Sequence, residues 1–394
     1  MSTPGLMADA AQVSARESSV RKPTVCFVSP AHWDRMRGGS EYQAKLLIDG
    51  LVEQRQVSAV YVANWTPDDS EAYDYSIARI STPSWLRKYG AFLDALSLYK
   101  HLKRIRPDVI FQVVGCGHTG ISAYYARNHG ARMIWRVASD RNVSPVAIPW
   151  WKKPHAYIER KFLDYGIRNA TVVVAQTRDQ QQLLAEYFDR SDSLLIRNFH
   201  PEPDEPVEKN PGPVKVLWVG NLKRLKNPAA FIRLAEELEK ISDAQFIVIG
   251  GESDDPEWVE GIKREMASQP NISYLGSVSQ ERVNSLLAEA HLLVNTSDFE
   301  GFPNTFIQAW MRQVPVVSLN VDPDRLLSEK GLGRVCGTEA RLHEESRRLI
   351  DDAKLREELG TKCRDYALEN HSNKNMLTLI NLICADSEGE ARQA

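Results

Sequence analysis

A carboxylate, an apparent helix start and an amide follow one another in SDFEGFPNTFIQAW, residues 297–310. The preceding HLLVNTS (291–297) reads as a buried strand, so Glu300 lies at a strand's carboxyl end, where open α/β sheets bind ligands. PNT (303–305) suits a helix start, whose free N–H groups and positive dipole end favour phosphate. Glu300 repels phosphate but accepts hydrogen bonds from hydroxyls, and Gln308 lies two helical turns beyond the strand. The pattern predicts a ligand with phosphates at one end and a sugar at the other.

A cationic stretch, VGNLKRLKNP (219–228), follows the first strand of the second half of the chain. Lys223, Arg224 and Lys226 place three cations within four residues, beside Gly220. A lysine at a strand's carboxyl end can neutralise a departing diphosphate. The alternative is a solvated basic turn, which is the commoner origin of such runs.

Paired glycines occur between the first predicted strand and the first predicted helix, in GGSE (38–41). Gly38 and Gly39 would let backbone N–H groups approach a phosphate or a sugar. The alternative is a flexible turn in which Ser40 caps the helix. Neither half of the chain has G-x-G-x-x-G after its first strand, which argues against a dinucleotide oxidoreductase.

These residues are positioned by two series of short apolar strands that alternate with helical segments. The first series predicts a helix at 41–54 and strands at 24–30, 57–64, 108–115, 132–138 and 170–177. The second predicts a helix at 228–241 and strands at 214–221, 244–251, 272–278, 291–297 and 314–320. Continuous apolar strands alternating with helices indicate parallel sheets covered on both faces. The expected fold class is α/β, with two doubly wound domains facing a cleft.

The chain divides at HPEPDEPVEKNPGPV (200–214), whose prolines and acidic residues exclude a helix or a central strand. We expect an N-terminal domain at 23–200, a linker at 201–213 and a C-terminal domain at 214–372. The first 22 residues lack the apolar core of a secretion signal, so residues 1–22 are predicted to be a disordered tail.

Composition is that of a soluble globular chain, with 43% hydrophobic and 26% charged residues among 394 and no apolar run that would span a membrane. Five scattered cysteines without a CxxC pair suggest neither a zinc site nor a disulfide framework. Residues 23–200 contain 23 Lys and Arg against 17 Asp and Glu, a net charge of +6. Residues 201–394 contain 23 Lys and Arg against 33 Asp and Glu, a net charge of −10. The half that carries the motifs is acidic, which argues against nucleic-acid binding.

The chain resembles the retaining glycosyltransferases of family 4, which have the GT-B fold of two Rossmann-like domains. The family's signature is Glu, seven residues, Glu. Here Glu300 and GFPNTFI are followed by Gln308. VGNLKRLKNP is similar to a second family motif: Gly220 and Lys226 match, but Asn221 stands where the arginine usually is. The resemblance runs from about residue 24 to the C-terminus.

This resemblance implies roles for individual residues. Lys226, Glu300 and His118 would be catalytic. His118 in GCGHTG matches a histidine that family members often place near the transferred sugar. The alternative is that His118 is a structural or surface histidine. Glu300 would hold sugar hydroxyls, Lys226 the diphosphate and Gln308 the ribose. The implied donor-binding set is Gly38, Gly39, Gly220, Asn221, Lys223, Arg224, Val278, Gly301, Phe302, Asn304, Thr305 and Gln308. Within it, the backbone of Asn304 and Thr305 would bind the diphosphate, and Val278 would lie by the base. A helix at about 373–390 would cross back to the N-terminal domain.

The activity implied is transfer of a sugar, with retention, from a nucleotide-diphosphate sugar to a hydroxyl acceptor, in surface polysaccharide or glycolipid assembly. No cofactor and no metal is expected, since DPD (322–324) imitates a metal-binding DxD but is more simply a turn. Asn221 and Gln308 depart from the family pattern, so a degenerate, non-catalytic sugar-nucleotide-binding subunit stays an alternative. A sugar-nucleotide epimerase of the same fold is another.

Two segments combine aromatic with basic residues, WLRKYGAFLDALSLYKHLKRIRP (85–107) and IPWWKKPHAYIERK (148–161). Such segments can lie on an anionic membrane surface. The alternative is ordinary helices that cover a sheet and expose a solvated outer face. On the membrane interpretation, a lipid-linked acceptor approaches the positively charged N-terminal half. The protein would then be cytoplasmic and peripheral at the inner face of the membrane.

Overall fold

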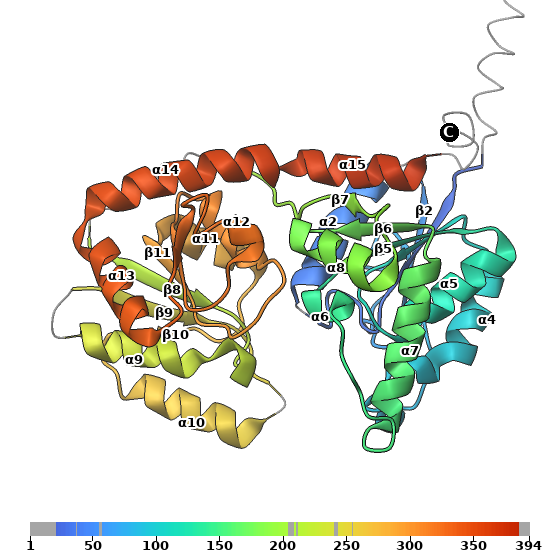
Figure 1. Cartoon of the computed structure of the whole chain (residues 1–394), viewed down its shortest axis with the longest axis horizontal. Helices are drawn as coiled ribbons and strands as arrows, with labels where there is room; N and C mark the ends of the chain where they lie inside the picture. The colour runs from blue at the N-terminus through green and yellow to red at the C-terminus, as the bar shows by residue number, and fades with distance from the viewer. Residues whose placement is uncertain are drawn as a thin grey trace, which may run out of the picture.

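The computed structural model describes residues 21–36, 38–54, 57–203, 209, 212–239, 243–253 and 255–385. Three predicted features lie partly outside these residues: the disordered tail (1–20), the linker (204–208, 210 and 211) and the end of the crossover helix (386–390). The described chain forms two α/β domains side by side, and the C-terminal helices run along one edge of both (Figure 1).

Seven parallel strands form the N-terminal sheet, in the order β3-β2-β1-β4-β5-β6-β7. The strands are β1 (Thr24–Val28), β2 (Ser58–Ala63), β3 (Ser76–Arg79), β4 (Val109–Gln112), β5 (Arg132–Arg136), β6 (Val172–Ala175) and β7 (Leu194–Leu195). The helices are α2 (Gly39–Glu53), α3 (Ser84–Arg87), η1 (Ala91–Asp94), α4 (Ala95–Ile105), α5 (Gly117–His129), α6 (Asp140–Val143), α7 (Pro154–Asn169) and α8 (Arg178–Phe188). All five predicted strands are present.

Strand β1 shows why this sheet is covered on both faces. Val25 and Phe27 pack in one hydrophobic cluster with α2 and the last helix, α15 (Asn373–Cys384). Cys26 and Val28 point the other way, into a cluster with α4, α5, α7 and α8. Side chains alternate across a strand, so an uninterrupted apolar strand must bury both faces.

Six parallel strands form the C-terminal sheet, in the order β10-β9-β8-β11-β12-β13. The strands are β8 (Lys215–Val219), β9 (Gln245–Ile249), β10 (Ile272–Tyr274), β11 (Leu292–Asn295), β12 (Val316–Ser318) and β13 (Gly333–Val335). The helices are η2 (Arg224–Lys226), α9 (Pro228–Leu238), α10 (Pro256–Ala267), α11 (Gln280–Glu289), α12 (Asn304–Trp310), η3 (Pro323–Arg325), α13 (Glu339–Asp351) and α14 (Ala353–Asn370). One hydrophobic cluster fills this domain.

The two passages of the chain between the domains are bonded to each other. The first passage leaves through Asn198 and His200, and the second returns at His371, between α14 and α15. The backbone N–H of His200 donates to the carbonyl of His371 at 2.9 Å, and His371 Nδ1 lies 2.7 Å from the carbonyl oxygen of Asn198. Burial lowers the pKa of His371 to about 3, so its ring is neutral at this crossing.

Candidate functional site

A cavity lies between the domains, at the carboxyl ends of strands from the C-terminal sheet. The N-terminal domain contributes the start of α2 and Tyr42, and the C-terminal domain contributes the loops after β8, β9 and β10 and the starts of α11 and α12. The lining residues are Gly38, Gly39, Tyr42, Val219, Gly220, Asn221, Lys223, Lys226, Ile249, Gly250, Gly251, Ser277, Val278, Gln280, Val283, Glu300, Pro303, Asn304, Thr305 and Gln308. The arrangement follows the rule that ligands bind beyond the carboxyl ends of parallel strands.

An ion pair between Lys226 and Glu300 occupies one wall of this cavity. Lys226 Nζ lies 2.6 Å from Glu300 Oε2, and the two side chains are 26% and 16% exposed. Glu300 Oε1 accepts hydrogen bonds from Ser297 Oγ at 2.6 Å and Asn295 Nδ2 at 2.9 Å. The hydroxyl of Thr296 donates to the Lys226 carbonyl at 2.8 Å, which ties the two loops together. The carboxylate is therefore held by three donors, and the ammonium stays accessible from the cavity.

Two glycines permit the close approach of backbone segments around the cavity. Gly250, after β9, has φ +156°, and an added Cβ would lie 1.9 Å from the carbonyl oxygen of Gly220. A Cβ on Gly39 would lie 3.0 Å from Asn304 Nδ2. A side chain at Gly250 would push the loops apart, because backbone atoms occupy the space. At Gly39 the amide of Asn304 would have to shift by a few tenths of an ångström.

Asn304 links the two domains at the cavity floor. Its Nδ2 donates to the carbonyl of Gly39 at 2.7 Å, and its Oδ1 accepts from Asn198 Nδ2 at 2.8 Å. Asn198 Oδ1 in turn accepts from the buried Arg136, at the end of β5, at 2.5 Å. Burial lowers the pKa of Arg136 to about 9. This chain of hydrogen bonds fixes the glycine loop of one domain against the start of α12 in the other.

Gln308 lines the cavity but has little exposed surface (3%). Its Nε2 donates to Gln280 Oε1 at 3.1 Å and to Asn284 Oδ1 at 3.0 Å, both on α11. The amide is therefore positioned by the neighbouring helix, and a ligand would meet its edge.

The three cations predicted after β8 take different directions. Lys223 and Lys226 line the cavity, whereas Arg224 pairs with Asp255 at 2.9 Å and lies over the Trp258 ring, outside the lining set. The prediction that Arg224 binds the donor is therefore not supported by its position. Asn221 lines the cavity, and its Oδ1 accepts from the N–H of Gly251 at 3.2 Å.

Gly301 and Phe302 lie outside the main cavity and line an adjoining one. The two cavities share Gly39, Lys226, Glu300, Pro303 and Asn304. The adjoining cavity is completed by residues of the N-terminal domain, namely Ser40, Gln43, Ala138, Ser139, Gln176 and Asn198, together with Leu225 and Phe299. Lys226 and Glu300 thus stand at the boundary between two connected spaces.

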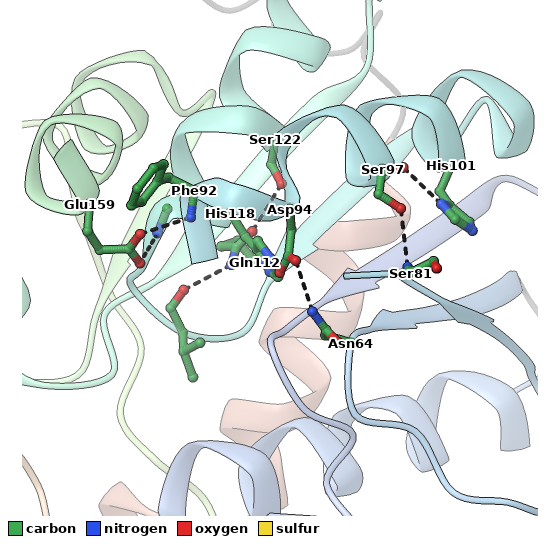
Figure 2. Close-up of polar contacts among 12 residues, drawn as sticks. Asn64, Ser81, Phe92, Asp94, Ser97, His101, Gln112, His118, Ser122 and Glu159 are labelled. Atoms are coloured by element: carbon green, nitrogen blue, oxygen red, sulfur yellow. Dashed lines mark hydrogen bonds and ion pairs between the residues drawn. The ribbon is translucent and has the colours of Figure 1, made fainter. Parts of the chain in front are cut away.

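His118 is the predicted site residue that the structure separates most clearly from the cavity. It lines neither cavity, its side chain is fully buried, and its Nε2 lies 2.7 Å from Asp94 Oδ2. Figure 2 shows the imidazole directed at Asp94, which also accepts from Asn64 Nδ2 at 2.9 Å. In this conformation His118 cannot touch a ligand in the cavity, because protein encloses its ring on every side. The position of His118 therefore does not support the expected contact with the sugar.

Burial by itself would raise the pKa of the Asp94 carboxyl, but the hydrogen-bond partners of Asp94 lower that pKa by more. The hydrogen bond and charge of His118, with hydrogen bonds from Thr82 and Asn64, hold that pKa below its usual range. Asp94 is therefore ionised and closely paired, as expected of a structural pair in the N-terminal domain.

The two carboxylates of DPD (322–324) are bonded to backbone N–H groups. Asp322 Oδ1 accepts from the N–H of Leu327 at 2.7 Å. Asp324 accepts from the N–H groups of Arg178 and Asp179, at the start of α8, at 3.1 and 3.2 Å. Within the described part of the chain, no group of three or more His, Cys, Asp or Glu side chains is arranged to hold a metal ion.

Several lining residues were not predicted from the sequence. The Gly250–Gly251 pair directly follows β9, and the argument made for Gly38 and Gly39, that paired glycines let backbone N–H groups approach a ligand, would have identified it. Tyr42 directly follows GGSE. Gln280 and Val283 come from α11, which reaches the cavity only through tertiary packing, and no local pattern marks them.

Two family models match the chain. The model for glycosyltransferase family 4 matches residues 37–200, and the model for glycosyl transferases group 1 matches residues 200–366. The alpha-galactosylglucosyldiacylglycerol synthase of Streptococcus pneumoniae (strain ATCC BAA-255 / R6) is 29% identical over 208 residues. That match covers 49% of this chain and 54% of the relative, so the chain spans about half the length of that relative.

Solved structures resemble the whole described fold. WaaG, a glycosyltransferase involved in lipopolysaccharide biosynthesis, matches with a TM-score of 0.74 and 15% identity over 92% of this chain and 100% of that chain. Anabaena Alr3699/HepE in complex with UDP and glucose matches with a TM-score of 0.71 and 14% identity over 91% and 98%. These likenesses confirm the predicted fold class.

A search of the described helices finds none with the length and apolar character needed to cross a membrane. The two family models meet at residue 200 and together cover residues 37–366. The chain belongs to glycosyltransferase family 4, the glycosyl transferases group 1 with the GT-B fold.

Proposed function

We propose that this protein is a retaining glycosyltransferase that moves a sugar from a nucleotide-diphosphate sugar to a hydroxyl acceptor. One observation carries the proposal: an accessible Lys226–Glu300 pair stands in a cavity that both domains line. A cation suits the diphosphate and a carboxylate suits sugar hydroxyls, so the pair marks the junction between the two parts of such a donor.

The donor replaces the ion pair when it binds. The Lys226 ammonium pairs with the diphosphate, to which the backbone N–H groups of Asn304 and Thr305 also donate hydrogen bonds. Glu300 accepts hydrogen bonds from the hydroxyls of the sugar. Gln308 meets the ribose and Val278 the base. The sugar extends towards the adjoining cavity, where Gly301 and Phe302 form part of the wall.

In the proposed reaction the acceptor hydroxyl attacks the face from which the diphosphate leaves. The bond from the sugar's anomeric carbon to the diphosphate breaks, the bond to the acceptor oxygen forms, and a departing phosphate oxygen takes the acceptor's proton. Lys226 stabilises the negative charge that develops on the leaving group, so the reaction proceeds without a metal ion. The protein supplies positioning and electrostatic stabilisation.

The acceptor class we propose is a glycolipid or surface polysaccharide, and the site of action is the cytoplasmic face of a membrane. The Streptococcus relative is named for a diacylglycerol glycolipid and the WaaG structure for lipopolysaccharide biosynthesis, which supports this choice. The structure solved with UDP and glucose makes UDP sugars the first donors to test.

The test is a thermal-shift screen against UDP, GDP and ADP, followed by product mass with each matching sugar donor. A nucleotide that binds the folded state stabilises it by about 2.7 kcal/mol at 100 times its Kd. The proposal predicts an acceptor that gains one sugar. Sugar-nucleotide conversion without acceptor would indicate an epimerase, and binding without conversion would indicate the non-catalytic alternative. A protein that no nucleotide stabilises would contradict the proposal.

A further inference from the structure

Exposed large hydrophobic side chains of the described chain are concentrated in one part of the N-terminal domain. Between residues 85 and 158 they are Trp85, Tyr89, Leu93, Leu96, Tyr124, Val146, Trp150, Trp151, Tyr157 and Ile158. Leu96 is 78% exposed, and Trp85 and Trp151 are each 68% exposed. In the described C-terminal domain (214–370), by contrast, Leu275 is the exposed residue of this kind. A concentration of this kind marks an interaction surface.

These segments form what we call the aromatic face: α3 with residues 88–89, η1, α4, Tyr124 of α5, the loop 146–153 and the start of α7. Helices α3, α4, α5 and α7 all pack against η1, and the loop 146–153 leads directly into α7. The ring of Tyr89, two residues after α3, lies 5.7 Å from that of His155 at the start of α7. The Tyr99 ring lies 6.1 Å from that of Tyr124, between α4 and α5. In Figure 1, α4 and α5 lie at the end of the molecule farthest from the C-terminal domain, and α7 lies beside them.

Buried polar contacts hold the η1 segment beneath this face. Glu159, on α7, accepts hydrogen bonds from the backbone N–H of Phe92 at 2.9 Å and of Gly117 at 2.7 Å (Figure 2). The Asp94–His118 pair fixes the end of η1 against α5. With its backbone tied on the inner side, the segment presents Leu93 and Leu96 outwards.

An apolar groove runs through the aromatic face, between α4, α5 and α7. It has a volume of about 610 Å³ and is lined by Ala95, Leu96, Tyr99, Gly120, Ile121, Tyr124, Lys161, Phe162 and Tyr165. Lys161 is the charged residue of this lining. The volume is within the range of pockets that hold small apolar ligands.

Cations are interleaved with the aromatic rings. Lys88 lies over Tyr89, Lys103 over Tyr99 and Lys161 over Tyr157, at 5.1, 5.9 and 5.3 Å. Lys100, Arg104, Lys152 and Lys153 are also exposed in these segments. None of these seven side chains forms an ion pair among the described residues.

The carboxylates of residues 84–169 are occupied by other protein groups. They are Asp94 with His118, Asp108 with Arg21, Asp140 with Gln180, Glu159 with backbone N–H groups, and Asp164 with Arg160. None of these carboxylates pairs with the seven cations, so the face is both apolar and positively charged.

We propose that the aromatic face binds the surface of an anionic phospholipid bilayer, and that the groove receives an acyl chain. Tryptophan and tyrosine favour the interfacial region of a bilayer, and nearby lysines are attracted to its anionic headgroups. The inference deepens the proposed function, on which it rests for the lipid nature of the acceptor, and it adds the residues and the surface that bring the enzyme to that acceptor.

The test is co-sedimentation of the full chain with two kinds of vesicle, in the absence of any sugar donor. One kind is phosphatidylcholine alone, and the other contains about one third phosphatidylglycerol. We expect binding to the anionic vesicles at low salt and weaker binding as salt is raised. The variant Lys152→Gln/Lys153→Gln should bind about 25-fold more weakly, because each charge near an anionic surface contributes roughly fivefold. Trp150→Ala/Trp151→Ala should weaken binding at every salt concentration.

The matched controls lie in the C-terminal domain. Lys330→Gln/Lys362→Gln removes two exposed charges there, and Leu275→Ser removes an exposed apolar side chain. Both should bind vesicles as the unchanged protein does, and unfolding temperatures should confirm that all variants fold. Thermal shifts with nucleotides on the same samples test the donor site separately. A failure of membrane binding can therefore be distinguished from a failure of the proposed glycosyltransferase function.

Three results would overturn the inference. They are no binding to anionic vesicles at low salt, equal binding to neutral vesicles, and binding that the variants of the aromatic face leave unchanged. A self-association that Trp150→Ala/Trp151→Ala abolishes would likewise overturn it, because a second copy of the chain would then cover this face.

Discussion

Two acid–base pairs of this molecule have similar contact distances but differ in their exposure to solvent. Lys226–Glu300 and His118–Asp94 have the same kind of short contact, 2.6 and 2.7 Å. The side chains of the first pair are 26% and 16% exposed and line a cavity, whereas those of the second are 0% and 5% exposed and line neither cavity of the site.

The difference teaches that position at a strand's carboxyl end does not by itself make a site. His118 follows β4 much as Lys226 follows β8. Segment η1 and Glu159 cover the start of α5 and bury His118. Lys226, by contrast, faces the cavity between the domains. We therefore propose that the buried pair contributes to stability and that the accessible pair binds the ligand.

The largest effect is expected from breaking the buried pair. Asp94→Ala removes the partner of His118 and an acceptor of Asn64, and loss of one member of a buried pair typically lowers stability by about 3–5 kcal/mol. Urea unfolding measures the change. Asp49→Ala is the control, because its pair with Lys45 is exposed and should contribute about 0–1 kcal/mol. Equal losses of unfolding free energy in Asp94→Ala and Asp49→Ala would contradict a special contribution of the buried pair to stability.

The accessible pair should show the opposite profile. Glu300→Gln keeps the shape and the acceptor for Ser297 but loses the charge, so turnover should fall about 100-fold with little change in unfolding free energy. Release of nucleotide from the donor measures turnover. The control is Glu289→Gln, which breaks an exposed pair with Lys215 and should leave turnover unchanged. A stability loss as large as that of Asp94→Ala would mean that Glu300 is structural.

Much of the lining of the candidate site could be predicted from the sequence because its signals are local. Glu300, Asn304 and Gln308 belong to one strand–loop–helix unit, and GGSE to another, so the order of elements already placed them at the ends of parallel strands. The parallel strands themselves were evident from continuous apolar runs. Strands β3, β7 and β13 were not, since they have at most four residues and at most one buried position each.

The enclosure of His118 could not be predicted, because it depends on η1 and α7, which are distant in the sequence. Glu159 reaches Phe92 across 67 positions and Gly117 across 42. The outward turn of Arg224 likewise depends on Asp255 and Trp258 of the next strand–helix unit. Local patterns give the type of a residue and its place on an element, whereas its exposure is a property of the packed domain.

Acid pH should reduce the contribution of the buried pair to stability. The pKa of Asp94 is held below its ordinary value of about 3.9, so its contribution to stability is present above that pH and is lost as pH falls through the lower folded value. The stability gap between the unchanged protein and Asp94→Ala should therefore narrow below about pH 4, by at most about 1.4 kcal/mol per pH unit. Urea unfolding between pH 6 and pH 3 measures it. A gap that widens in acid would contradict the assigned direction.

The smallest effect is expected at the edge of the accessible site. Gln308→Glu restores the carboxylate of the family signature, and a charge-assisted bond to a ribose hydroxyl would strengthen donor binding by about 1 kcal/mol, roughly fivefold in KM. Turnover should change by less than about threefold. Steady-state kinetics with varied donor separates the two parameters. A large gain in turnover at unchanged KM would show that Gln308 acts on the transition state.

The central claim is that Lys226 stabilises the departing diphosphate, and turnover of Lys226→Ala at saturating donor tests it most directly. The variant should fold with nearly unchanged stability, because its pair with Glu300 is partly exposed, and its turnover should fall about 100–1,000-fold. Near-normal turnover of the folded variant would contradict the assignment.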